Sequence, residues 1–369
     1  MTFSDLRERL NDLDVVKNAP SKNYIYHLSH NDLDGYSAQL VAKRFLGQTK
    51  RFNSGYGLEV SAKLSLIGSL IEKTPNRDEN LILISDLNIT REDCKLINEI
   101  VGSLKKSGHK IELKLLDHHK SGAALAEEFE WYFLDESKCA TKIVYDWCSE
   151  RVGDCEAARD KELGEYVACV NAYDLWLEDE RDRFEFGKAL NRLVMDAREI
   201  SSALFSFEEN DYHLSLLEAA FEYLEGYRNI DLDDQIIAIK KSYLRGGGER
   251  DTIDNLSARF VTKLLIQNRD RMKVNYEGHK GILTFQIGNI SVLGNAFLSQ
   301  CPDYDFILDV GRNGNISLRA DGKIDVSVMA AKLFGGGGHA NAAGGRIKDF
   351  KETYTYEQLF DRIAPILNV

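Results

Sequence analysis

Apolar positions follow two different periods along the first half of the chain. Within Ile111–Leu115 apolar residues alternate with charged ones, which is the period of a half-buried strand. The run Leu81–Ile84 is continuously apolar and too short for a helix, so it predicts a buried parallel strand. Segments with helical spacing separate these strands, and a capping-box pattern at Thr90 and Asp93 opens one of them. Strands that alternate with helices predict a parallel sheet with crossover helices.

The spacing of apolar residues delimits each element of this region, beginning with an amphipathic N-terminal helix over Met1–Val16. It predicts strands over Tyr24–Ser29, Lys50–Asn53, Leu81–Ile84, Ile111–Asp117 and Trp131–Leu134, and helices over Tyr36–Phe45, Ala62–Glu72, Thr90–Lys106, Ser137–Cys148 and Glu156–Tyr173.

The second half of the chain has a different pattern. Long helical patterns rich in Leu, Tyr and Glu run over Phe184–Leu244, and Gly246–Gly248 marks a hinge or a helix stop. From about Met272 the pattern changes to short strands and turns, which predicts a second, α+β domain. It contains strands over Gly281–Ile287, Phe306–Val310 and Ile316–Ala320, a hairpin with a primed turn over Arg312–Asn315, and a helix over Asp325–Phe334.

We therefore expect an α/β protein in three parts. An N-terminal parallel-sheet domain would occupy residues 1–183, a helical connector 184–271, and a smaller C-terminal α+β domain 272–369. The 369 residues are enough for two or three domains with full cores, and 43% of them are hydrophobic, as in soluble globular proteins.

Charge and cysteine content narrow the class of protein. The formal net charge of -12 argues against a protein that wraps long DNA or RNA, although a short anionic substrate in one local pocket stays open. The six cysteines form no Cys-x-x-Cys pair, which fits a reduced, cytoplasmic compartment. No apolar run approaches the roughly 20 residues of a membrane span, and Met1–Val16 lacks the apolar core of a signal peptide.

Acidic and imidazole side chains gather where predicted strands end. His-Asn-Asp-Leu-Asp-Gly at 30–35 follows the first strand, Asp86 the third, and Asp117–His119 the fourth, while Asp174 stands at a helix end. Each motif has a plainer interpretation: a turn with helix-capping carboxylates, a polar loop, or an ordinary helix terminus. In a doubly wound parallel sheet, however, the carboxyl ends of neighbouring strands face one crevice, where these groups would meet. Carboxylates and imidazoles without thiolates favour a pair of manganese or magnesium ions, and such a pair clamps a phosphoryl group and generates hydroxide.

The C-terminal part holds a glycine-rich motif, Gly-Gly-Gly-Gly-His-Ala-Asn-Ala-Ala-Gly-Gly at 335–345. Consecutive glycines leave backbone N–H groups unshielded, which suits close approach to an anion. The alternative is a flexible linker, but linkers are usually built from Ser, Gly and charged residues.

Taken together, these motifs resemble the DHH phosphoesterase family, named for the Asp117-His118-His119 triplet as it stands here. The resemblance covers nearly the whole chain, because the motif at 30–35, Asp86 and Asp174 look like that family's other metal motifs. The segment 335–345 looks like its associated C-terminal substrate-binding domain. The layout is most similar to the bacterial nanoRNase and oligoribonuclease branch, with RecJ-type exonucleases as more distant relatives.

The resemblance implies a role for each motif residue. One metal ion would be held by His30, Asp32 and Asp86, and the other by Asp34, Asp86, His118 and Asp174, with Asp86 as the bridge. Manganese is the expected metal, with magnesium and cobalt as alternatives. His119 would face the substrate phosphate and Asp117 would orient the imidazoles, so His119, Asp117 and Asp86 form the catalytic set. The substrate-binding candidates are Gly336, Gly337, Gly338, His339, Arg319 and Arg312.

The leading functional hypothesis is a metal-dependent phosphodiesterase that cleaves short oligoribonucleotides or linear dinucleotides to mononucleotides through a metal-activated water. The nearest alternatives are a 3′-phosphoadenosine 5′-phosphate phosphatase and a cyclic-dinucleotide phosphodiesterase; a non-catalytic nucleotide-binding regulator is a different class. The expected partner is a short oligonucleotide or dinucleotide, not a long duplex or a membrane, and the oligomeric state, a homodimer included, stays open.

Overall fold

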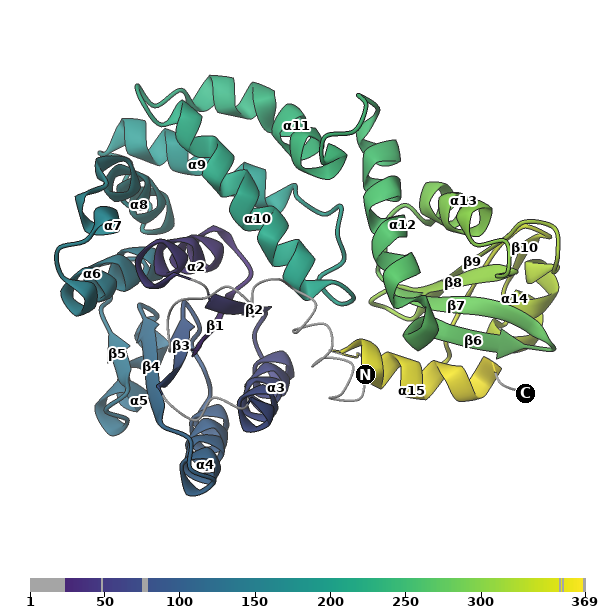
Figure 1. Cartoon of the computed structure of the whole chain (residues 1–369), viewed down its shortest axis with the longest axis horizontal. Coiled ribbons are helices and arrows are strands. Elements are labelled where there is room, and N and C mark those ends of the chain that lie inside the picture. Colours follow the sequence, from purple (N-terminus) through teal and green to yellow (C-terminus); the bar gives the residue numbers. More distant parts are fainter. Residues whose placement is uncertain (1–23, 48, 75–78, 352, 354, 368–369) are drawn as a thin grey trace. The chain divides into compact units, whose positions relative to one another are not determined.

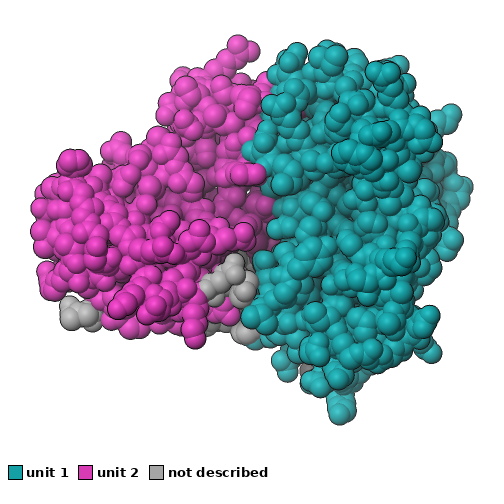
Figure 2. Space-filling model, turned by 180° about the vertical axis from the view of Figure 1, so that it is seen from behind, with its two compact units in different colours: residues 1–196, 210–236 teal, residues 197–209, 237–369 magenta. Residues whose placement is uncertain are grey.

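The computed structural model describes residues 24–47, 49–74, 79–351, 353 and 355–367, so the helix expected over Met1–Val16 lies outside the described residues. The chain forms two compact units (Figure 2). Unit 1 comprises residues 1–196 and 210–236, and unit 2 comprises residues 197–209 and 237–369. None of the helices in the described ranges has the length and apolar composition needed to cross a membrane.

Unit 1 is built on a five-stranded parallel sheet in the order β2-β1-β3-β4-β5 (Figure 1). Each strand that the sequence predicts for this unit is present, with bounds that differ by one residue at most. The strands are β1 (Tyr24–His30), β2 (Thr49–Ser54), β3 (Asn80–Ser85), β4 (Ile111–Asp117) and β5 (Tyr132–Leu134).

Helices cover both faces of this sheet, as expected for parallel strands joined by crossovers. On one face lie α3 (Leu58–Lys73) and α4 (Arg91–Lys106), and on the other lie α2 (Leu33–Leu46) and α6 (Ala140–Val152) (Figure 1). Within the described part of residues 24–196, the remaining helical elements are η2 (Lys120–Gly122), α5 (Ala123–Glu128), α7 (Glu156–Arg159), α8 (Lys161–Asp174) and α9 (Arg181–Met195).

Local sequence signals explain several helix ends. The predicted capping box is present at the start of α4, where Thr90 and Asp93 each bond the other's backbone N–H. The continuous helix expected over Glu156–Tyr173 is instead two helices. Asp160 interrupts it, because this residue is extended and its carboxylate accepts hydrogen bonds from the N–H groups of Glu162 and Leu163.

The sequence predicts a helical segment from residue 184 onward, and two of its helices each contain residues of both units. These are α10 (Ser206–Ala220) and α11 (Asn229–Arg245), separated by the short η3 (Phe221–Tyr223). The helix α11 ends before Gly246 and Gly247, both at positive φ, so these glycines mark a helix stop. The division into 1–183, 184–271 and 272–369 as functional parts stays a prediction.

Unit 2 contains a six-stranded sheet in the order β10-β11-β9-β8-β7-β6, in which only β7 and β8 run parallel. Its α+β character agrees with the sequence. Its strands are β6 (Lys273–Tyr276), β7 (His279–Phe285), β8 (Phe306–Val310), β9 (Asn315–Ala320), β10 (Gly337–His339) and β11 (Ala342–Arg346), and its helices include α12 (Ile253–Met272), α13 (Ile290–Gln300), α14 (Val326–Phe334) and α15 (Tyr356–Leu367).

Two details of unit 2 differ from the sequence-based expectation. The β8–β9 turn is not a primed turn, since positive φ occurs there only at Gly314; the longer loop is closed by a Gly311–Gly314 hydrogen bond. The glycine-rich segment is neither an open loop nor a linker but the hairpin β10–β11. A Cβ at Gly336 would lie 1.9 Å from the Gly344 carbonyl oxygen, so two backbones pass too closely there for any side chain.

Candidate metal centre

The predicted residues of unit 1 meet at the carboxyl edge of its sheet. His30 ends β1, Asp117 ends β4, and Asp86 follows β3 directly. Parallel pairing aligns these ends, because Ser29 lies opposite Ser85 and Ser85 opposite Leu116. Asp86 turns away from the strand with φ 55°, a left-handed conformation that is rare outside glycine, asparagine and aspartate. This turn lets its carboxylate lie beside side chains from both neighbouring strands.

Three overlapping groups of side chains could each hold a metal ion. Within each group the potential ligand atoms lie within 4.8 Å of one another, and Asp86 and His118 each belong to two groups. The groups are His30 with Asp32 and Asp86, Asp86 with His118 and His119, and Asp34 with His118 and Asp174.

Short distances tie these groups together. His118 Nε2 lies 3.3 Å from Asp86 Oδ1 and 3.7 Å from Asp34 Oδ2, while its Nδ1 lies 3.6 Å from Asp174 Oδ2. His30 Nδ1 lies 2.7 Å from Asp32 Oδ2 and 3.9 Å from the second oxygen of Asp86. Residues from four separate parts of the chain thus form one continuous cluster, with Asp86 at its centre.

Two of the carboxylates are held by helix N-termini. Asp32 is the N-cap of α2, and its Oδ1 accepts a hydrogen bond from Gly35 N at 3.0 Å. Asp34 is buried, and its two oxygens accept hydrogen bonds of 2.7 Å from Ala140 N and Thr141 N at the start of α6. These two hydrogen bonds fix the orientation of the Asp34 side chain.

The cluster carries more negative charge than its own residues neutralise. Burial, together with the neighbouring Asp34 and Asp32 carboxylates, raises the pKa of Asp86 well above its ordinary value. The same causes raise the pKa of Asp174 to about 8. The Oδ2 atoms of both residues are buried without a hydrogen-bond donor from the part of the chain that the structure describes. Unsatisfied carboxylate oxygens beside imidazoles, with no thiolate among them, fit hard or borderline divalent cations such as manganese or magnesium.

His119 belongs to a separate hydrogen-bonded chain at the edge of the cluster. Its Nδ1 lies 2.7 Å from Asp117 Oδ1, and the Tyr132 hydroxyl donates to Asp117 Oδ2 at 2.7 Å. Burial disfavours the Asp117 carboxylate, but these hydrogen bonds outweigh it and lower its pKa. The bond to Asp117 in turn raises the pKa of His119. Asp117 therefore orients the partly exposed imidazole of His119, which is protonated more readily than that of a free histidine.

The sequence did not point to several residues that support the site. Tyr132 holds Asp117, Asn53 donates to the His30 carbonyl oxygen at 2.8 Å, and Tyr56 lies against both His30 and His119. Asn53 and Tyr56 lie at the end of β2, so the rule that led to Asp86 and Asp117 also applies to them. They were missed because neither side chain is a usual metal ligand.

The helix α10 also reaches this region through buried amides. Asn210 Nδ2 donates to Asn53 Oδ1 at 2.7 Å and to Gln39 Oε1, while its own Oδ1 accepts from Arg51 Nε. The side chain of Asn53 therefore makes one hydrogen bond to α10 and another to the end of β1 that carries His30. A helix of the predicted connector thus supports the backbone of a candidate ligand.

The substrate candidates of unit 2 fall at two different ends of its sheet. His339 pairs with Ala342, and Ala342 pairs with Arg319, so these residues lie at the same end of adjacent strands. The Arg319 guanidinium donates to Ser291 Oγ at 2.8 Å. Arg312 stands in the turn before β9, at the opposite end of that strand, so the structure does not bring it near Arg319.

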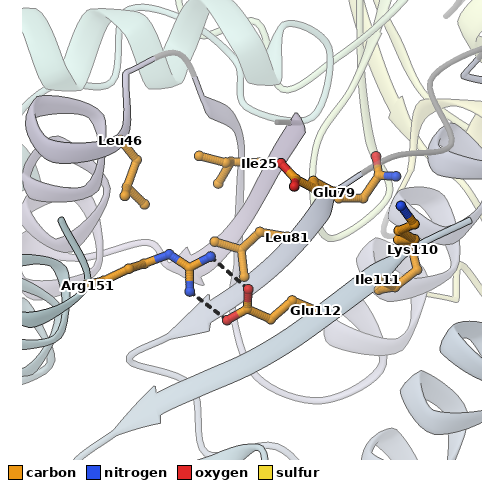
Figure 3. A pocket seen from close by; sticks show the side chains of 9 residues that line it. Ile25, Leu46, Glu79, Leu81, Lys110, Ile111, Glu112 and Arg151 are labelled. Carbon is orange, nitrogen blue, oxygen red and sulfur yellow. Dashed lines mark hydrogen bonds and ion pairs between the residues drawn. The ribbon is translucent and has the colours of Figure 1, made fainter. Parts of the chain in front are cut away.

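A cavity of about 460 Å³ lies at the opposite edge of the unit 1 sheet, where the strands begin (Figure 3). Two of its charged lining residues pair with each other, because Arg151 donates two hydrogen bonds of 2.7 Å to Glu112. None of the predicted site residues lines it. The candidate site is therefore the polar cluster at the carboxyl edge and not this cavity.

Comparison with known proteins gives relatives along nearly the whole chain. A Helicobacter pylori protein named 3′,5′-cyclic-nucleotide phosphodiesterase is 39% identical over 345 residues, which cover 93% of this chain and 99% of that protein. Oligoribonuclease NrnB of Bacillus subtilis is 28% identical over 337 residues, 88% of this chain and 73% of NrnB. The crystal structure of a protein from Helicobacter pylori G27 matches with a TM-score of 0.85 and 39% identity, over 94% of this chain and 100% of that one. No family model matches the chain.

Proposed function

Because this chain belongs to the DHH/RecJ-like phosphoesterase family and is a hydrolase of phosphodiester bonds, we propose that it releases mononucleotides from very short oligoribonucleotides or linear dinucleotides. The observation that carries the proposal is the convergence of five Asp and three His side chains at the carboxyl edge of the unit 1 sheet. The similarity to a protein named oligoribonuclease supports a short RNA substrate.

The metal-binding roles follow from the three overlapping groups. His30, Asp32 and Asp86 would hold one divalent ion, and Asp34, Asp86, His118 and Asp174 the other, with manganese as the first candidate. When bound, such ions supply charge neutralisation at the phosphate and a water of lowered pKa. Asp86 would serve both positions, since its two oxygens face His30 on one side and His118 on the other.

The remaining residues of the cluster would act on the substrate directly or through one neighbour. His119, held by Asp117 and partly exposed, is placed to donate a hydrogen bond to a phosphate oxygen. Asp117 keeps Nδ1 of that imidazole protonated, which leaves Nε2 for the substrate side. In unit 2, His339 and Arg319 would bind the nucleotide together with the backbone of Gly336, Gly337 and Gly338.

The test is a product analysis with a labelled dinucleotide. Purified protein supplied with manganese should convert it to mononucleotides, and chelation by EDTA should stop the reaction. A nucleotide-binding regulator would instead retain the dinucleotide intact. Including 3′-phosphoadenosine 5′-phosphate and a cyclic dinucleotide in the same assay separates the two nearest alternatives.

A second candidate activity is hydrolysis of 3′,5′-cyclic mononucleotides. The name of the 39% identical relative favours it, and a cyclic nucleotide also presents one phosphodiester to the same cluster. The kcat/KM values for a dinucleotide and for a cyclic mononucleotide, measured side by side, decide between the candidates. A higher value for the cyclic substrate would replace the oligoribonucleotide proposal.

A further inference from the structure

Tyr56 is an exposed aromatic residue at the candidate metal centre. It is 50% exposed, although tyrosines that pack in the core of this chain are almost completely buried. Its ring centroid lies 4.8 Å from that of His30, and its hydroxyl oxygen lies 3.3 Å from His119 Nε2. A half-exposed ring in contact with two cluster residues is available to a molecule that binds there.

The loop that carries Tyr56 is held at both sides. It joins β2 to α3, and Gly55 N donates to the Glu59 carboxylate at 3.0 Å. The Ser54 hydroxyl donates to the Gly55 carbonyl oxygen at 2.7 Å, and Gly57 adopts a positive φ of 83° before the helix begins. Tyr56 is therefore presented to the cluster by a braced turn, and the entropy cost of ordering its ring on binding is reduced.

The hydroxyl and the ring of Tyr56 can make two different kinds of contact. The hydroxyl oxygen lies within hydrogen-bond distance of Nε2 of His119, whose Nδ1 is engaged by Asp117, so it contacts the nitrogen that would face the substrate. The ring offers an apolar face beside a cluster suited to phosphate. Single-stranded nucleic acids are bound in this way elsewhere, with bases stacked on aromatic rings while charged groups engage the backbone.

Resting on the function proposed above, we infer that Tyr56 contacts the substrate: its ring stacks on the nucleobase next to the phosphate at the cluster, and its hydroxyl orients His119. Stacking recognises every base by its π-face, so this contact favours nucleotides without selecting their sequence.

The experiment distinguishes the contribution of the Tyr56 ring from that of its hydroxyl, and binding of the base from binding of the phosphate. Manganese-loaded wild type, Tyr56→Phe and Tyr56→Ala are titrated with AMP and with ribose 5-phosphate, which lacks the base. Wild type and Tyr56→Phe should prefer AMP, and Tyr56→Ala should lose about tenfold of that preference while its affinity for ribose 5-phosphate matches that of Tyr56→Phe, which also lacks the hydroxyl. Phe133→Ala, which removes a ring of 44% exposure on β5, serves as control and should keep the preference.

Kinetics on a dinucleotide then test the hydroxyl. Tyr56→Phe should lower kcat with little change in KM, because the ring remains, whereas Tyr56→Ala should also raise KM. Equal loss of affinity for AMP and ribose 5-phosphate in Tyr56→Ala, or an unchanged AMP preference, would overturn the inference. The binding arm needs no turnover, so a wild-type protein that binds AMP through Tyr56 but does not cleave the dinucleotide would refute the proposed function alone.

Discussion

At the scale of single residues, Asp86 shows how a functional carboxylate can oppose stability. Its burial, together with the neighbouring Asp34 and Asp32 carboxylates, raises its pKa well above the ordinary value. The arrangement makes sense as a cation site, because removal of the positive ions leaves a repulsive cluster in the folded state. A metal-binding role and a stability cost therefore belong to the same side chain.

Asp86→Asn should abolish turnover while leaving the protein folded. Asn is chosen because it tolerates the left-handed backbone of this position better than Ala does. In EDTA the variant should melt at a temperature equal to or above that of the wild type, since it lacks the buried carboxyl group whose raised pKa disfavours folding above the ordinary pKa of aspartate, and the rise in Tm on adding manganese should be lost. Near-normal activity with manganese would refute the bridging role.

Asp309 is a second buried carboxyl group, located on β8 in unit 2. Burial raises its pKa to about 7, against hydrogen bonds to its Oδ1 from the Thr284 hydroxyl at 2.9 Å and Ile287 N. Between its ordinary pKa of 3.8 and about 7, the unfolded chain has lost this proton while the folded chain keeps it. The folded state binds more protons in this range, so stability falls as pH rises.

Asp309→Asn should therefore stabilise the protein at pH 8 and have little effect near pH 4. The Asn Oδ1 can accept the same two hydrogen bonds, and the gain at high pH is at most about 4 kcal/mol for a shift of roughly three pKa units. Denaturant unfolding of both proteins at the two pH values measures the difference. A gain that is the same at both pH values would show that ionisation of Asp309 is not its cause.

At the scale of elements, α10 supports the end of β1 through buried amides. Asn210 satisfies Asn53, Gln39 and Arg51, and Asn53 in turn holds the His30 carbonyl oxygen. Removing a hydrogen-bond partner from buried polar groups costs more than the bond itself contributes, because those groups lose water as well. The strand end that carries His30 consequently depends on a helix about 180 residues further along the chain.

Asn210→Ala should lower the free energy of unfolding by about 2 to 3 kcal/mol and weaken manganese binding. The weaker binding follows because Asn53 loses its support and the backbone at His30 is less well ordered. Denaturant titration and metal titration measure the two effects. Ser215→Ala is the matched control, since this residue lies on the same helix and takes no part in the hydrogen bonds of Asn210; equal effects of the two variants would contradict the role of the amides.

At the scale of the whole molecule, the net charge of -12 limits which nucleic acids can bind well. A long anionic strand meets mostly repulsive surface, and proteins that process long single strands use extended basic grooves lined with aromatic rings. The sequence offers few basic candidates near the predicted site, chiefly Lys120, Arg312, Arg319 and Arg346. Extra phosphates beyond a short substrate should therefore add no affinity.

We expect kcat/KM to be highest for RNA of about two to five nucleotides and to fall for longer strands. The measurement compares oligomers from dimers to a strand of roughly 24 nucleotides at one fixed salt concentration, because salt alone changes such affinities. Equal or higher efficiency on the longest strand would favour a processive exonuclease over a nanoRNase.

The sequence by itself determined the parallel sheet of unit 1 and which residues stand at its strand ends. The period and the length of an apolar run are local properties of the sequence. The start of a helix is likewise marked by local capping residues such as Thr90 and Asp93. Because parallel strands place their carboxyl ends at one edge, local signals were enough to predict that His30, Asp86 and Asp117 would lie close together.

Only the tertiary structure decided which side chains support this cluster. The contacts of Asp34 with the start of α6, of Asn210 with Asn53, and of Tyr56 with His119 join segments far apart in sequence, and no periodicity encodes them. Similarly, Arg312 and Arg319 look equivalent in the sequence, yet in the structure they lie at opposite ends of β9. Such placements depend on register and packing between elements, which are set by the whole fold and not by any one stretch of the chain.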